Sequence, residues 1–226
     1  MEFILDSADI EKIRFCTEHL PVAGVTTNPS ILGRSGRKDV FRVLEEILSL
    51  IPGRLLHVQV TAGEAEGMCR EAEVLRKHFG DRVAVKVPVT VEGLTCIRAL
   101  KAQGYTVTAT AVYSRIQAYF AVAAGADFIA PYYNRIETGG TDAAALVRDL
   151  RSVIDREGSR TRILAASFHR EEQVVAALTA GAHAVTVQPD MYIAMLSSPV
   201  VEKALTDFDR DWSGLGGLKR FFELEQ

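Results

Sequence analysis

The sequence predicts a single (β/α)8 barrel, the α/β fold in which eight parallel strands alternate with helices. Short apolar runs alternate with longer amphipathic stretches from one end of the chain to the other. About eight such β-α units occur in 226 residues, which is near the lower size limit of this fold. No Gly-rich dinucleotide turn follows the first apolar run, so the doubly wound sheet, the main competing fold, is not favoured.

The predicted strands are short apolar runs that end in turn or helix signals. They cover residues 3–6, 24–27, 55–60, 83–87, 106–111, 128–131, 163–167 and 184–187. The predicted helices have apolar residues near i, i+3 and i+4, and cover residues 40–50, 64–79, 90–102, 114–124, 141–154 and 170–180. We expect one domain over residues 1–226, in which residues 201–226 form a C-terminal helical extension. This extension contains Trp212, Phe221 and Phe222, and we expect it to contact a neighbouring subunit.

The composition is that of an ordinary globular enzyme, with 48% hydrophobic and 24% charged residues. A formal net charge of −3 argues against a nucleic-acid partner, which requires a concentrated basic surface. The start of the chain lacks the basic segment of a signal peptide, and no apolar run approaches the roughly 18 residues needed to span a bilayer. We therefore expect a cytoplasmic protein with no membrane partner.

Neither a metal nor another cofactor is expected. Cys16, Cys69 and Cys96 are scattered, which fits a reducing compartment and neither a zinc framework nor a disulfide scaffold. No His, Asp and Glu residues have the spacing of metal ligands. His57 shares a strand face with Gln59 and is expected to line the barrel.

Lys86 interrupts the apolar, β-branched run of residues 83–89. Burying an ammonium group without a counter-charge is expensive, so such a lysine finds a partner or loses its proton. A neutral lysine in a dry pocket is a nucleophile that forms Schiff bases with carbonyl compounds. The alternative is a lysine at a strand end whose amine extends to water. Because side chains alternate along a strand, Lys86 points into the barrel if Val85 and Val87 face the helices.

Polar residues follow most of the predicted strands, and in this fold the active site lies at the carboxyl ends of the strands. The candidates are Asp6, Thr26, Asn28, Gln59, Thr110, Tyr132, Asn134, Arg135 and Ser167. Any one of them alone is more simply a cap or a solvated loop residue, but together they converge on one barrel mouth. For Asp6 the alternatives are a charge partner of Lys86 and the cap of a helix that starts near Ile10.

Two arginines are candidates for binding an anion, because phosphate sites in this fold recur in the loops after the later strands. Arg135 follows the sixth predicted strand, and Arg170 opens a helix after the seventh. A guanidinium group offers bidentate contacts to a phosphate. Arg170 is equally well explained as a solvent-facing helix residue.

Five longer motifs resemble those of the transaldolase family. They are residues 24–31 (GVTTNPSI), 85–90 (VKVPVT) with 92–94 (EGL), 110–113 (TAVY), 130–135 (APYYNR) and 165–168 (AASF). The resemblance runs from Leu5 to about Trp212. It implies a barrel enzyme in which Lys86 forms a Schiff base with a ketose substrate.

Within this family, two residues favour the fructose-6-phosphate aldolase subgroup. Transaldolases usually have a glutamate in place of Gln59 and a phenylalanine in place of Tyr132. The resemblance therefore implies an aldolase that reversibly cleaves fructose 6-phosphate or a similar ketose into dihydroxyacetone and glyceraldehyde 3-phosphate. The closest alternative is a transaldolase, which transfers the dihydroxyacetone unit between sugar phosphates. An alternative from another class is a non-catalytic barrel that binds sugar phosphates.

The resemblance also implies roles for individual residues. Tyr132 would be the general acid/base, with Gln59 and Thr110 positioning a shared water. Asp6 and Asn28 would contact the ketose hydroxyls. The other expected substrate contacts are Thr26, Ser30, Asn134, Arg135, Ser167, His169 and Arg170.

Three positions depart from the family pattern. His169 stands where relatives have lysine or arginine, so the anion site would use Arg170, or the substrate would carry a sulfonate or no phosphate. Gln188 stands where a proline or a small apolar residue is common. Tyr133 follows Tyr132, which leaves two candidates for the catalytic phenol. Family members commonly assemble as pentamers stacked into decamers, so we expect a homo-oligomer.

Overall fold

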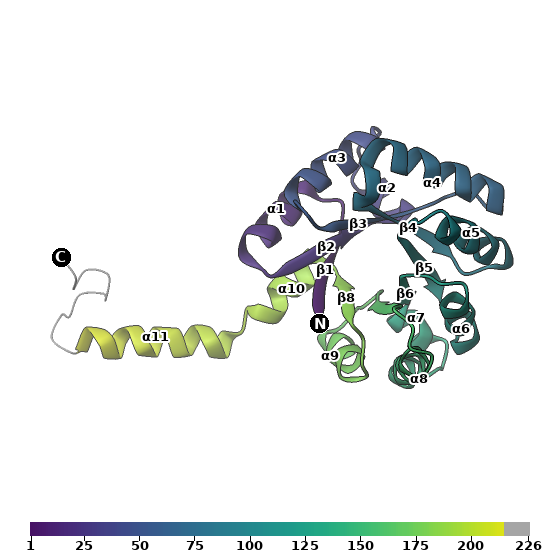
Figure 1. The fold of residues 1–226 in the computed structure, drawn as a ribbon. Helices are drawn as coiled ribbons and strands as arrows, with labels where there is room; N and C mark the ends of the chain where they lie inside the picture. The colour runs from purple at the N-terminus through teal and green to yellow at the C-terminus, as the bar shows by residue number, and fades with distance from the viewer. Residues whose placement is uncertain (215–226) are drawn as a thin grey trace. The chain divides into compact units, whose positions relative to one another are not determined.

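The computed structural model describes residues 1–214. Met1–Pro189 form one compact unit, and a second unit begins at Asp190. In the first unit, parallel strands β1 to β8 pair in chain order, and β8 pairs back onto β1 to close the barrel. Helices lie outside the strands (Figure 1). The predicted (β/α)8 fold is confirmed.

The strands are all short and largely buried. They are β1 (Glu2–Asp6), β2 (Val22–Thr26), β3 (Leu55–Gln59), β4 (Val83–Pro88), β5 (Val107–Val112), β6 (Phe128–Pro131), β7 (Arg162–Ala165) and β8 (Ala184–Val187). Each lies within two residues of its predicted bounds. Side chains from four strands, Ile4, Phe128, Leu164 and Ala184, pack together inside the barrel, which is therefore a filled core.

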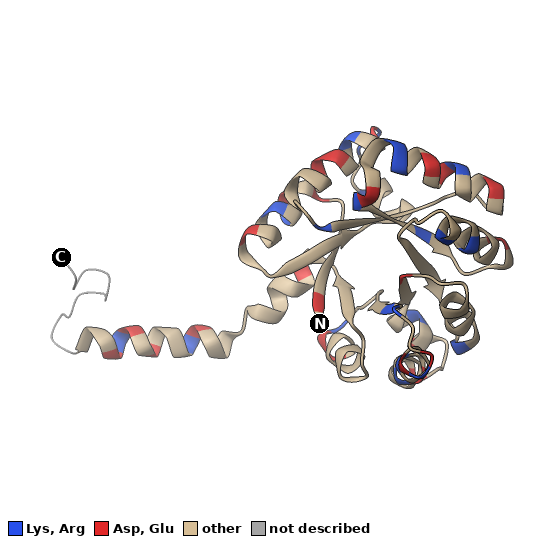
Figure 2. Ribbon diagram, in the orientation of Figure 1, with Lys and Arg blue, Asp and Glu red and all other residues tan. Residues whose placement is uncertain are grey.

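The helices of the first unit carry most of its charged residues, whereas the strands carry few (Figure 2). They are α1 (Ile10–His19), α2 (Pro29–Arg34), α3 (Val40–Leu50), α4 (Ala65–Phe79), α5 (Val91–Ala102), α6 (Arg115–Ala123), α7 (Tyr133–Thr138), α8 (Ala143–Arg156) and α9 (Glu171–Thr179), with the 3-10 helix η1 (Gly80–Arg82) before β4. Several of the predicted helices start at the residue that is the N-cap of the observed helix. Ser114, for example, caps α6 in a capping box with Gln117. The sequence did not predict α2 or α7, which have six residues each.

Two helices belong to the end of the described chain. α10 (Pro189–Leu196) begins at the last residue of the first unit, and α11 (Pro199–Gly214) lies in the second. Trp212 belongs to α11, while Phe221 and Phe222 lie outside the described residues. That residues 201–226 contact a neighbouring subunit stays a prediction. Within residues 1–214, no helix is both long enough and apolar enough to cross a membrane.

Candidate active site

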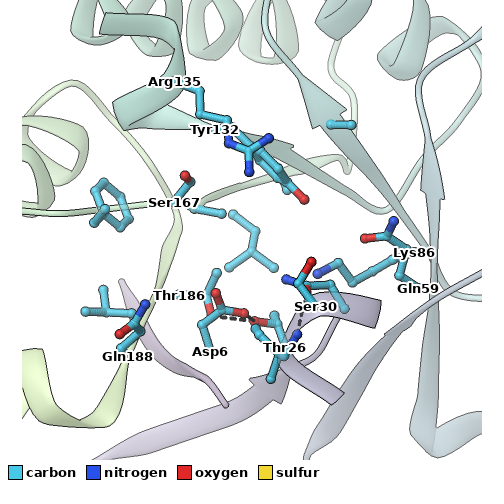
Figure 3. A pocket seen from close by; sticks show the side chains of 18 of the residues that line it. Asp6, Thr26, Ser30, Gln59, Lys86, Tyr132, Arg135, Ser167, Thr186 and Gln188 are labelled. Atoms are coloured by element: carbon cyan, nitrogen blue, oxygen red, sulfur yellow. Dashed lines mark hydrogen bonds between the residues drawn. The ribbon is translucent and has the colours of Figure 1, made fainter. Parts of the chain in front are cut away.

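A cavity of about 440 Å³ opens at the carboxyl ends of the strands, which is a typical size for a small-molecule site. Ten of the predicted site residues line it: Asp6, Thr26, Asn28, Ser30, Gln59, Lys86, Tyr132, Arg135, Ser167 and His169. Figure 3 shows that the labelled members of this set surround the same space, although they come from different strands and helices. The predicted convergence on one barrel mouth is thus present in the fold.

Lys86 lies on β4 with its side chain toward the cavity, and only 5% of its surface is exposed. Its flanking valines, Val85 and Val87, are also buried. Burial lowers the pKa of Lys86 below the usual value of 10.5, while the nearby carboxylate of Asp6 opposes the shift. Lys86 Nζ donates a hydrogen bond to the carbonyl oxygen of Thr27 at 2.8 Å. The amine is therefore held in a fixed position by the backbone after β2 and is more easily deprotonated than a free lysine.

Asp6 is a charge partner of Lys86, as one of the two alternatives predicted, although the two side chains form no ion pair within residues 1–214. The other alternative, a cap of α1, is wrong. Asp6 Oδ1 accepts a hydrogen bond from Thr26 Oγ1 at 2.6 Å, and Asp6 acts on Lys86 only through its electric field. The cap of α1 is Asp9, whose side chain accepts from the backbone N–H of Lys12. Burial raises the pKa of Asp6, and the charge of Lys86, the Thr26 hydrogen bond and the charge of Arg34 oppose that rise.

Tyr132, rather than Tyr133, is the phenol of the cavity. Its Oη lies 3.1 Å from Thr110 Oγ1, and either oxygen can be the donor. Thr110 does not itself line the cavity and reaches it through this contact. Burial raises the pKa of Tyr132, so the phenol keeps its proton at neutral pH. Tyr133 is 1% exposed and packs against Phe168, with ring centroids 5.5 Å apart.

Gln59 and Lys86 occupy paired positions on the adjacent strands β3 and β4. Both side chains line the cavity, and Figure 3 shows them next to each other. Asn28 begins α2 as its cap, and its Oδ1 accepts a hydrogen bond from the N–H of Ile31 at 2.9 Å. The amide nitrogen of Asn28 is thus left to face the cavity.

Arg135, in the first turns of α7, places a cation at the edge of the cavity. Its guanidinium carbon lies 5.5 Å from the centre of the Tyr132 ring. Its Nη1 donates to Tyr113 Oη at 3.3 Å. No carboxylate in residues 1–214 forms an ion pair with Arg135, which leaves its charge available to an anionic ligand.

Two predicted anion or substrate contacts lie outside the cavity. Arg170 Nη2 lies 3.3 Å from Glu137 Oε2 in an ion pair, and Asn134 Oδ1 accepts a hydrogen bond from Gln173 Nε2 at 2.9 Å. Neither residue lines the cavity. The suggestion that Arg170 replaces the basic residue missing at His169 is therefore not supported, because α9 turns Arg170 toward Glu137 of α7.

Sequence reasoning also missed residues that line the cavity, namely Arg34, Thr108, Tyr113 and Thr186. Thr186 Oγ1 lies 2.7 Å from Thr26 Oγ1, which extends the hydrogen-bond chain that begins at Asp6. Thr108 Oγ1 lies 2.8 Å from Nδ1 of buried His57, whose pKa burial lowers to about 3. His57 is therefore neutral and lies inside the barrel, as predicted. Strand alternation could have indicated Thr108, since it is in register with Lys86.

The Glu-Gly-Leu motif after β4 has a steric explanation. A Cβ atom on Gly93 would lie 1.8 Å from the carbonyl oxygen of Pro88. Only glycine therefore lets the first turn of α5 approach the end of the strand that carries Lys86. In residues 1–214, no group of three or more His, Cys, Asp or Glu side chains could hold a metal ion.

Fold and site together define a (β/α)8 barrel with a polar cavity at the carboxyl ends of its strands, into which a buried lysine points. The model of the transaldolase/fructose-6-phosphate aldolase family matches residues 3–218. The chain is 45% identical over 213 residues to a probable fructose-6-phosphate aldolase of Streptococcus pneumoniae, over 94% of this chain and 96% of that protein. This chain belongs to the transaldolase/fructose-6-phosphate aldolase family, and it is an enzyme of the aldolase or transaldolase type.

Proposed function

We propose that this enzyme is a class I aldolase, which uses a Schiff base to cleave fructose 6-phosphate or a similar ketose reversibly into dihydroxyacetone and glyceraldehyde 3-phosphate. The observation that carries this proposal is Lys86, an amine buried at the carboxyl end of β4 and facing a cavity of about 440 Å³. The name of the Streptococcus pneumoniae relative, a probable fructose-6-phosphate aldolase, supports the same substrate.

The first step is attack of neutral Lys86 Nζ on C2 of the ketose, followed by loss of water and uptake of one proton to form a protonated imine. The lowered pKa of Lys86 increases the neutral fraction of the amine. Asp6 and Asn28, on the β1 and β2 side of the cavity, contact the hydroxyls of the ketose near C2. Thr26, whose hydroxyl also lies within hydrogen-bond distance of Thr186, holds the Asp6 carboxylate in place for this contact.

The second step breaks the C3–C4 bond. The C4 hydroxyl gives its proton to a water held between Gln59 and Thr110, C4 becomes the aldehyde carbon, and the bonding electrons remain on C3 as an enamine. Tyr132, which keeps its proton because its pKa is raised, donates to C3. The water returns a proton to the phenolate. A further water hydrolyses the imine, which releases dihydroxyacetone and restores Lys86.

The distal phosphate binds on the opposite side of the mouth. Arg135 supplies a cation without an ionic partner in residues 1–214, and the hydroxyl of Ser167 and the ring of His169 line the same cavity. Ser167 has a φ of 63°, a conformation that is uncommon for a residue with a side chain. Such strain is typical of functional positions that the surrounding structure holds in place.

The second candidate function is transfer of the dihydroxyacetone unit to an acceptor aldehyde. It shares every step up to the enamine and differs in whether C3 is then protonated. Gln59 and Tyr132 both line the cavity and favour protonation and release, hence the aldolase. We also propose that the enzyme acts on sugar phosphates of the pentose phosphate pathway in the cytoplasm and assembles as a pentamer or decamer. The native mass in solution tests the assembly.

Borohydride trapping tests the proposed function. The purified enzyme is incubated with fructose 6-phosphate, reduced, digested and analysed by mass spectrometry. We expect a reduced ketose or dihydroxyacetone adduct on the peptide that contains Lys86, and none on the exposed lysine Lys77. Free dihydroxyacetone formed without an acceptor aldehyde identifies the aldolase, and strict dependence on an acceptor identifies the transaldolase. Absence of any adduct with a panel of phosphorylated, sulfonated and neutral ketoses rejects the Schiff-base mechanism.

A further inference from the structure

Two cysteines that are 27 positions apart in the sequence lie in contact on adjacent helices. Cys69 belongs to α4 and Cys96 to α5, and their Sγ atoms are 3.4 Å apart. The two helices lie side by side on the outside of the barrel (Figure 1). We propose that Cys69 and Cys96 form a reversible modification site, a disulfide made by exchange with a small-molecule disulfide, and that this bond lowers the turnover of the enzyme. The bond itself is independent of the proposed function, and only its effect on turnover rests on that function.

The pair has a geometry from which a disulfide forms with little movement. A disulfide bond is roughly 2.05 Å long, so the two sulfur atoms must approach each other by about 1.3 Å. Cys69 is half-buried and open to a small reagent, whereas the side chain of Cys96 is completely buried. The simpler alternative is that the two thiols only fill space between the helices, as free cysteines often do. The two interpretations differ in whether the pair is oxidised in the folded enzyme.

The chemistry is thiol–disulfide exchange, in which atoms and electrons balance. The thiolate of Cys69 attacks one sulfur of a small disulfide, which forms a mixed disulfide and releases a small thiolate that takes up the proton lost by Cys69. Cys96 then gives up its proton, its sulfur bonds to Cys69 Sγ, and the second small thiol leaves with that proton. Two protein thiols are oxidised, and one small disulfide is reduced to two thiols. Because burial raises the pKa of Cys96 to about 12, Cys69 is the thiol that reacts first.

Closing the bond requires the two helices to move. Cys96 is packed on all sides in a dense interior, so rotation of its side chain alone does not supply the movement. The first turns of the helices are closely tied to their surroundings. Glu92 Oε2 of α5 accepts a hydrogen bond from the N–H of Ala65, the first residue of α4, at 3.0 Å. A Cβ atom on Gly67 would lie 2.8 Å from the Cβ atom of Ala62, which precedes α4. Movement at the helix starts is therefore passed to the loops before them.

These loops follow the strands that carry Gln59 and Lys86. Gly93 holds the first turn of α5 against the end of β4, and the N–H of Val60, directly after β3, donates to the carbonyl oxygen of Lys86 at 3.0 Å. Movement of α4 and α5 thus shifts the ends of β3 and β4, from which Gln59 and Lys86 face the cavity. A misplacement of about 1 Å at reacting groups costs roughly 100-fold in rate. Because the closure is shared between two helices, we expect the disulfide to lower kcat by about 10-fold.

The experiment incubates the folded enzyme in buffers that contain oxidised and reduced glutathione in different ratios. Free thiols are then blocked, and the enzyme is digested without a reducing agent. The three cysteines fall in separate tryptic peptides, residues 15–34, 55–70 and 87–98, so mass spectrometry identifies each link. Initial rates are measured with a ketose that the enzyme turns over in the panel above, before and after addition of dithiothreitol. Circular dichroism and thermal melts check that the reduced and oxidised forms are folded.

The variants are Cys69→Ala and Cys96→Ala, and Cys16→Ala is the matched control, because it removes a buried thiol and leaves the pair intact. In the wild type and in Cys16→Ala, we expect a link between peptides 55–70 and 87–98 and a fall in kcat of about 10-fold, both reversed by dithiothreitol. Cys96→Ala should retain glutathione on Cys69, because the second exchange is missing. Cys69→Ala should form no disulfide and keep its full kcat in the oxidised buffers.

Three results overturn the inference. One is the absence of the link between peptides 55–70 and 87–98 in the folded wild type at every glutathione ratio, which would make the pair a packing contact. The second is an unchanged kcat in wild-type enzyme that carries the link. The third is an equal loss of kcat in Cys69→Ala, which would place the oxidation elsewhere. The link is detected without substrate, so a failure of the Schiff-base mechanism leaves that part of the test intact.

Discussion

Replacement of Tyr132 by phenylalanine should change the balance between cleavage and transfer, because it removes one hydroxyl from the site. That hydroxyl lies 3.1 Å from Thr110 Oγ1, beside the cavity. Losing one neutral hydrogen bond costs about 0.5–1.5 kcal/mol of folding free energy, and in a chain of this length that lowers Tm by only a few degrees. The variant should therefore stay folded.

The effect on the rate should be much larger than the effect on stability. General acid–base catalysis contributes roughly 10²–10⁴-fold, which corresponds to about 3–5 kcal/mol of activation free energy. Release of dihydroxyacetone requires protonation of C3, whereas transfer to an acceptor aldehyde does not. In Tyr132→Phe, release of free dihydroxyacetone should thus fall by about 100-fold or more, and the ratio of transferred to released product should rise.

The assay quantifies dihydroxyacetone and the transfer product from fructose 6-phosphate, with and without an acceptor aldehyde. Tyr133→Phe is the matched control: it makes the same chemical change one residue away, on a ring that packs against Phe168 and does not line the cavity. An unchanged product ratio in Tyr132→Phe would refute the reasoning. A selective loss of release in Tyr133→Phe would move the acid/base role to that residue.

Other predictions concern Lys86, the cysteines and Gly93. Lys86→Met should abolish turnover and trapping yet raise Tm at pH 7. Burial lowers the pKa of the lysine in the folded state, so the stability of the wild type rises with pH from that lowered pKa to 10.5, and the buried charge is a cost at lower pH that methionine removes. Wild-type turnover or a lower Tm would contradict this. The rate of borohydride trapping by the wild type should level off at a pH below 10.5, and a rise that continues to that pH would show an unperturbed amine. A thiol reagent at pH 7 should label half-buried Cys69 before Cys96, because Cys96 is buried and burial raises its pKa to about 12. Peptide mapping gives the order of labelling, and faster labelling of Cys96 would contradict the prediction. Gly93→Ala should lower the free energy of unfolding by about 3 kcal/mol or more, because the added Cβ would lie 1.8 Å from a backbone carbonyl oxygen. Gly33→Ala, with open space around the glycine, should change it very little. Equal denaturation midpoints for the two variants would refute the steric argument.

Strand positions were predictable from the sequence because barrel strands are apolar on both faces. The eight predicted strands match the observed ones within two residues. The position of Lys86 in the cavity follows from the alternation of side chains along β4, and most other lining residues follow from the rule that active sites lie at strand ends.

The residues that sequence reasoning misplaced depend on short helices. α2 and α7 have six residues each, too few to show a clear apolar period. Arg34 enters the cavity because α2 begins at the Asn28 cap and carries Arg34 back to the barrel mouth. Arg170 leaves the site because Glu137, on α7, pairs with it across the α7–α9 contact. Both outcomes depend on packing between elements, which local patterns do not encode.

Backbone strain gives independent support for the position of the site. In residues 1–214, only two residues other than glycine have positive φ, Ala111 at 56° and Ser167 at 63°. Both line the cavity, at the ends of β5 and β7. A left-handed conformation is costly for a residue with a side chain and persists only where the surrounding structure enforces it. Burial likewise raises the pKa of Asp6 and lowers that of Lys86, so both groups bear a desolvation cost that a stability-optimised barrel would avoid. Strained backbone and destabilised charges thus coincide at one end of the barrel, and that coincidence is expected when stability is given up for catalysis.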